Sequence, residues 1–89
     1  MGLTPGDIVY SIAGRDSGSY FVVVEADDSF AMICDGKSRK TDKPKRKKIK
    51  HLKTGCGRSE FIAEKLSRGE NVTNRELKRE LNLIQSINL

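Results

Sequence analysis

The segment 19–26, SYFVVVEA, limits the fold of this chain more than any other stretch. It is rich in β-branched and aromatic residues, which favour an extended backbone, and it therefore predicts a β-strand. Two shorter segments, 7–12 (DIVYSI) and 30–34 (FAMIC), lie on either side of it and have a similar composition. Glycine and aspartate residues separate the three segments, as in tight turns between antiparallel strands. This short, regular spacing is typical of a small β-barrel.

The hydrophobic pattern changes period in the last third of the chain. Apolar residues recur at helical spacing over 61–66, and Gly69 predicts the end of that helix. Thr73 and Glu76 then have the spacing of a capping box, and from Leu77 onward apolar residues follow at i+4 and i+7. Two short helices are marginally stable alone, so we expect them to pack against the predicted strands.

Positive charge is concentrated in one segment of the chain. Between Lys37 and Arg58 there are eleven Lys or Arg residues and one acid, Asp42. The 36 residues before this segment have six acids and one base, Arg15. Pro44 and the scarcity of apolar residues predict a loop here, with one short strand near 48–52. A cationic segment of this density favours polyanions, of which nucleic acid is the commonest in a cell.

A glycine-marked turn, GRDSG at 14–18, joins the first two predicted strands. With its strands it resembles the KOW motif, a short Gly-centred hairpin found in several ribosomal proteins and transcription factors. The resemblance rests on glycine, aspartate and valine residues of the hairpin: Gly6, Asp7, Val9, Gly14, Asp16, Gly18 and Val22–Val24. The longer stretch 4–53 is similar to the N-terminal domain of the ribosomal protein L-fourteen-e family, and to small bacterial KOW-domain proteins related to it. In that stretch a DG turn, basic residues and Lys50-His51-Leu52 follow the hairpin in order.

This resemblance implies an SH3-like barrel that binds structured RNA. We therefore expect a mostly β fold, with an SH3-like KOW barrel over residues 1–55 that includes the basic loop 37–53. Residues 56–89 are expected to form a C-terminal helical extension of one or two α-helices. The register of the first strand stays open, because Val9 on one face and Ile8 with Ile12 on the other compete for the core.

The predicted function is non-catalytic binding of structured RNA, either ribosomal RNA or the ribosome. The basic loop would contact backbone phosphates, and the GRDSG turn would fix the register of the protein on the RNA. The predicted RNA-binding residues are the cations of both segments and the polar residues beside them: Arg15, Ser17, Lys37, Arg39, Lys40, Lys43, Lys45, Arg46, Lys47, Lys48, Lys50, His51 and Lys53. Tyr20 and Phe21 point to opposite faces of one strand, so the ring outside the core either stacks on a base or is covered by the helices.

Two other functions remain open. The first is an SH3-like protein-interaction module whose basic loop binds an acidic partner, or whose C-terminal helices bind a partner helix. The second is binding of duplex DNA, although no helix with a basic recognition face is evident. A nuclease-resistant protein partner would favour the first over RNA binding.

The sequence does not predict an enzyme, a metal site or a cofactor. It contains no nucleophile–base pair and no glycine-rich phosphate loop of known spacing. His51, Cys34 and Cys56 lack the CxxC pairing of a zinc site, and we expect the two cysteines to be reduced thiols. No secretory signal and no apolar segment of membrane-spanning length is visible. A cytoplasmic monomer that does not bind membranes is the expectation.

Overall fold

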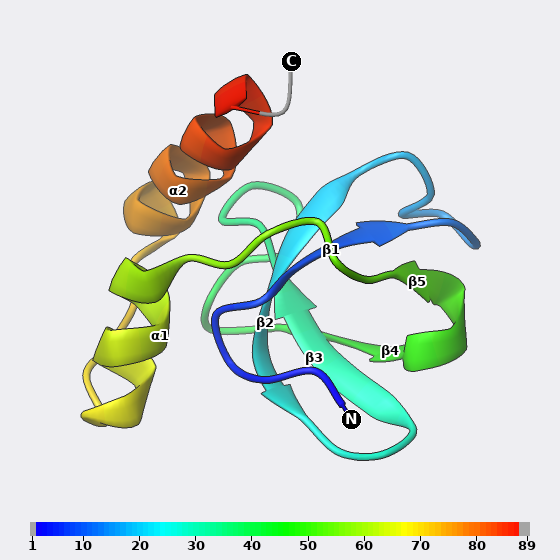
Figure 1. Ribbon diagram of the computed structural model, residues 1–89, viewed down its shortest axis with the longest axis horizontal. Helices are drawn as coiled ribbons and strands as arrows, with labels where there is room; N and C mark the ends of the chain where they lie inside the picture. The colour runs from blue at the N-terminus through cyan, green and yellow to red at the C-terminus, as the bar shows by residue number, and fades with distance from the viewer. Residues whose placement is uncertain (1, 88–89) are drawn as a thin grey trace.

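A five-stranded antiparallel sheet packs against two helices in the computed structural model, which describes residues 2–87 (Figure 1). The strand order is β4-β3-β2-β1-β5. The elements follow the chain in this order: β1 (Ile8–Ser11), β2 (Tyr20–Ala26), β3 (Phe30–Cys34), β4 (Lys45–Lys48), the 3₁₀ helix η1 (Ile49–His51), β5 (Leu52–Lys53), α1 (Glu60–Ser67) and α2 (Asn74–Ile87). The first three strands and both helices confirm the sequence predictions. Strands and helices have about equal shares of the chain, so the expectation of a mostly β fold is wrong.

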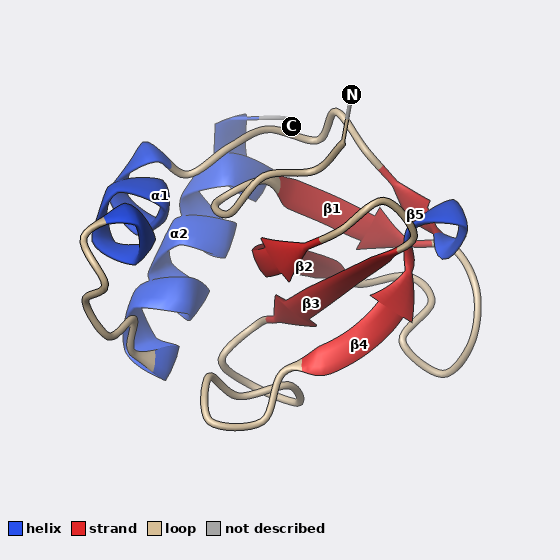
Figure 2. Ribbon diagram, turned by 90° about the horizontal axis from the view of Figure 1, so that it is seen from below, coloured by secondary structure: helices blue, strands red, loops and turns tan. Residues whose placement is uncertain are grey.

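The sheet is open and does not close into a barrel. Its two edge strands are β4 and β5 (Figure 2). They are short, with four and two residues. η1 separates them and turns the chain from the edge of β3 toward the edge of β1. Because an edge of two residues offers few backbone groups for pairing, β5 joins only β1 in the described part of the chain. The expectation of a closed barrel is therefore wrong.

Both faces of the sheet are covered. On one face Val9, Phe21 and Ile33 pack together, and Leu52 of β5 lies against them. On the other face Ile8 packs against the helices. Ile8 and Val9 are consequently 1% and 0% exposed. Each face of the sheet has its own core, so neither alternative for the register of the first strand holds alone, and Ile12 is 54% exposed.

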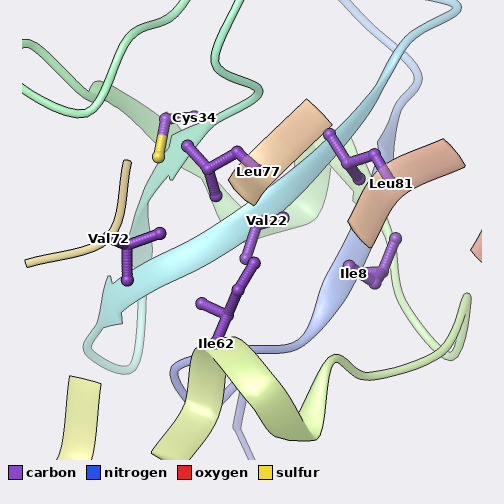
Figure 3. Packing of buried hydrophobic residues seen from close by; sticks show 7 residues of the cluster. All are labelled: Ile8, Val22, Cys34, Ile62, Val72, Leu77 and Leu81. Atoms are coloured by element: carbon purple, nitrogen blue, oxygen red, sulfur yellow. The ribbon is translucent and has the colours of Figure 1, made fainter. Parts of the chain in front are cut away.

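The helices contribute directly to the core on their side of the sheet. Figure 3 shows Val22 of β2 close to Ile62 of α1 and Leu77 of α2. All three side chains are fully buried, which confirms that the helices pack on the strands. Tyr20 is partly buried against the same cluster, whereas Phe21 is buried on the opposite face.

The capping box predicted at the start of α2 is present. The Thr73 backbone N–H donates to Glu76 Oε1 at 2.9 Å, and the Glu76 N–H donates to Thr73 Oγ1 at 3.1 Å. Lys65 of α1 adds an ion pair to Glu76 Oε2 at 2.9 Å. One carboxylate therefore starts α2 and ties it to α1.

Through Glu76 we expect the stability of the fold to depend on pH in the acidic range. The hydrogen bond from Thr73 and the Lys65 ammonium lower the pKa of Glu76 below its ordinary value of 4.5. The folded state thus binds this proton more weakly than the unfolded chain. The carboxylate stabilises the fold above pH 4.5, and the contribution is lost as the pH falls through the lower, folded pKa. Urea unfolding across this pH range should show the stability decreasing toward acid. The Glu76→Gln variant should show a smaller decrease. An identical pH profile in the variant would contradict this assignment.

Candidate nucleic-acid interface

The basic segment, residues 37–53, was predicted as a loop with one short strand near 48–52, and it contains more regular structure than that. β4 begins at Lys45 and pairs along its whole length with β3, from Ile33 opposite Lys45 to Phe30 opposite Lys48. Lysine and arginine have low strand propensity, but pairing with a hydrophobic neighbouring strand overrides that preference. A strand rich in lysine is also common at sheet edges, where its charges oppose pairing with a second copy of the same strand. The strand conformation of β4 therefore depends on its position beside β3, which the local composition does not reveal.

Asp16, in the turn between β1 and β2, holds two of the predicted RNA-binding residues. Its carboxylate accepts hydrogen bonds from Arg39 Nε at 3.3 Å and from Arg39 Nη2 at 3.4 Å. Lys47 Nζ lies 3.8 Å from Asp16 Oδ2 and donates to the carbonyl oxygen of Ala13 at 2.7 Å. Lys47 is only 8% exposed, so its charge is used inside the protein and we leave it out of the interface. The same contacts hold the GRDSG turn, with Arg15, against the basic segment.

The loop before β4 has defined internal bonds. The Asp35 carboxylate accepts from the backbone N–H groups of Lys37 at 2.9 Å and Arg39 at 2.8 Å. Further along, the Thr41 N–H donates to the side-chain oxygen of Asn74 at 2.8 Å, at the first residue of α2. The loop is therefore fixed at one end by its own turn and in its middle by a helix.

Close packing of this loop on α2 depends on Gly36. Its φ is +77°, and an added Cβ would collide with the backbone of Asn74. Gly55 has a similar φ of +75° but open space around it, so it is a matched control. We expect Gly55→Ala to cost about 1 kcal/mol from backbone strain alone. Gly36→Ala should lower the free energy of unfolding by about 3 kcal/mol, because the collision with Asn74 adds to the backbone strain. Equal costs in urea unfolding would contradict the contact with Asn74.

Most of the remaining predicted residues are solvent-exposed. Eight of the predicted cations are exposed and form no ion pair within residues 2–87: Arg15, Lys37, Lys40, Lys43, Arg46, Lys48, Lys50 and Lys53. Ser17 is also exposed, whereas Lys45 and His51 are half-buried. We call the eight exposed cations the basic surface. None of them forms an ion pair in the described residues, so they are available to an external anion. A backbone hydrogen bond from Phe30 lowers the pKa of Asp27, and the charge of Arg46 also lowers it.

Arg46 differs from the lysines around it. Its guanidinium carbon lies 3.5 Å from the centroid of the Phe30 ring, on the neighbouring strand β3. Stacking on a ring restricts the side chain and leaves the hydrogen-bonding edges of the guanidinium free. Arg46 is thus the most fixed of the phosphate-binding candidates.

The described residues hold no cluster of His, Cys, Asp and Glu side chains that could bind a metal ion. Burial raises the pKa of Cys34 to about 12, so this residue stays a neutral thiol at physiological pH. Within the described chain, neither helix combines the length and the apolar character needed to cross a membrane.

Comparison with known protein families and with curated proteins finds no match for this chain.

Proposed function

We propose that this protein binds structured RNA without catalysing a reaction, and that the basic surface contacts the RNA backbone. The observation that carries the proposal is the imbalance of charge around β4. The basic surface has eight exposed cations that form no ion pair in residues 2–87, while nearby Asp16 and Asp35 are occupied by internal hydrogen bonds. Lysine predominates, which suits electrostatic binding to phosphates more than recognition of base edges.

The hairpin turn supplies the second part of the proposed mechanism. β1 and β2 pair as an antiparallel hairpin, as the KOW resemblance implies, and the GRDSG turn at its end is exposed apart from Asp16. Because Asp16 binds Arg39 and Lys47, ion pairs join the turn to the basic segment. Arg15 and Ser17 on this turn would set the position of the protein along the RNA. The resemblance to the L-fourteen-e family supports ribosomal RNA as the ligand, in an SH3-like domain.

A second candidate is an acidic protein partner. β4 is an edge strand, so its outer backbone groups are open to pairing with an extended chain, and its lysines would favour an acidic one. Partner binding through the apolar stripe of α2 has less support. Leu77 and Leu81 are 0% and 5% exposed, so changing them would damage the fold instead of a surface.

Capture from cell lysate separates the two candidates. The tagged protein should enrich one structured RNA, and the enrichment should disappear after nuclease treatment. A variant with three exposed lysines reversed, Lys40→Glu, Lys43→Glu and Lys50→Glu, should not enrich it. Recovery of an acidic protein that survives nuclease treatment, with no RNA enriched, would contradict the proposal and favour the protein-interaction module.

A further inference from the structure

A shallow groove runs between α2 and the start of β2. It is lined by the segment 18–20, by the loop that holds Asp35 and Lys37, and by three polar residues of α2: Lys78, Asn82 and Gln85. These three are spaced i, i+4 and i+7, so they lie along one side of the helix. The groove thus joins the helical part of the chain to the basic surface, which Lys37 belongs to.

The polar side chains of the groove are available to a ligand. Within residues 2–87 the side chains of Lys37, Lys78, Asn82 and Gln85 make no hydrogen bond or ion pair. The one carboxylate in the lining, Asp35, is held by the N–H groups of its own turn. The groove therefore offers two ammonium groups and two amides, beside one carboxylate whose hydrogen bonds lie within its own turn.

Its floor is aromatic and aliphatic. Tyr20 packs against Tyr10, with ring centroids 4.8 Å apart and planes tilted by 58°, and it also contacts the helix-side core. Leu81 lies beside it and is almost fully buried. Tyr20 is therefore partly covered by the helices, as one of the two alternatives for its ring expected, and it also lines the groove.

We propose that this groove holds one unpaired nucleotide of the bound RNA; this inference rests on the proposed function and deepens it. Lys37 and Lys78 bind the phosphates on either side of the nucleotide. The base lies on the floor at Tyr20, as unstacked bases do on aromatic side chains in RNA-binding proteins. Asn82 and Gln85 hydrogen-bond its edge, since carboxamides offer the paired donor and acceptor that base edges require. An acidic peptide could also bind the lysines and the amides, but it carries no planar base to lie on Tyr20, and it is the less suitable occupant.

The test compares two RNA probes, a stem–loop with a randomised loop and the same stem as a blunt duplex. We expect the protein to bind the stem–loop about tenfold more tightly than the duplex. Asn82→Ala combined with Gln85→Ala should lower stem–loop affinity about tenfold and leave duplex affinity unchanged. Both sites are exposed and helical, so alanine keeps the fold and the net charge. Asn71→Ala removes an exposed amide outside the groove and should behave as the unmodified protein.

The outcomes separate this inference from the function on which it rests. If both probes bind equally and the double variant changes neither affinity, the groove holds no nucleotide, while RNA binding by the basic surface stands. If neither probe binds, the proposed function and the groove site are both wrong. If the double variant weakens both probes alike, the amides do not recognise an unpaired base, which also overturns the groove site.

Discussion

Affinity for structured RNA should fall about a hundredfold when three exposed lysines are reversed: Lys40→Glu, Lys43→Glu and Lys50→Glu. Each reversal removes a cation that can neutralise a phosphate and replaces it with a repelling charge. The net charge falls by two for each change, from +5 to −1. Since none of these side chains has an ion-pair partner in the described residues, the fold should keep its stability. Fluorescence anisotropy with a labelled stem–loop RNA measures the affinity, and circular dichroism checks the fold.

A charge-matched control separates the position of the charges from their number. Arg68→Glu, Arg75→Glu and Arg79→Glu also lower the net charge to −1, but they lie on or beside the helices and outside the basic surface. We expect this control to lose less than about tenfold in affinity, because the three arginines do not belong to the basic surface, and Arg68 and Arg79 already pair with Glu70 and Glu80. Equal losses in the two triple variants would mean that only net charge matters, and the basic surface would not be the interface.

The second large effect concerns stability and two neighbouring lysines. Lys47→Glu should cost about 3–5 kcal/mol of folding free energy, because it puts a second carboxylate beside the enclosed Asp16 and removes the cation there. Lys48→Glu, one residue further along β4, should stay within about 0.5 kcal/mol of the original stability, since this side chain is exposed. Lys48→Glu should still weaken RNA binding at unchanged stability, because Lys48 belongs to the basic surface.

Urea unfolding of both variants gives the measurement, and Lys47→Met is the control. Methionine keeps most of the aliphatic volume of the lysine without adding a negative charge. The stability of Lys47→Met should therefore lie between those of Lys47→Glu and Lys48→Glu. If Lys47→Glu were as stable as Lys48→Glu, Asp16 would not be the centre that joins the hairpin turn to the basic segment.

Local sequence patterns were sufficient for most of the secondary structure but not for the closure of the sheet. β2 was predictable because its β-branched residues favour an extended backbone. α2 was predictable because Thr73 and Glu76 form the capping box at its start. β4 was not predictable, since its strand conformation comes from pairing with β3 and not from its own lysines. The open edge of the sheet likewise depends on the shortness of β5, which composition does not encode.

The candidate site was predictable in its charge and not in its geometry. Counting residues identifies every cation of the segment, but it cannot separate Lys47, which is buried, from Lys48, which is exposed. That difference depends on the alternation of β4 side chains and on the position of Asp16 across the sheet. The groove on α2 was missed altogether, because Asn82 and Gln85 look like ordinary solvent-exposed helix residues until the helix is placed beside Tyr20.

The salt dependence of RNA binding tests the central claim most directly. If the basic surface neutralises about six phosphates of a partly single-stranded RNA, log K should fall linearly with log salt concentration at a slope of about −4. The variant with Lys40, Lys43 and Lys50 reversed should show a much shallower slope. A steep slope for the unmodified protein and a shallow one for the variant would support electrostatic docking of the basic surface on RNA. An affinity that does not change with salt would contradict it.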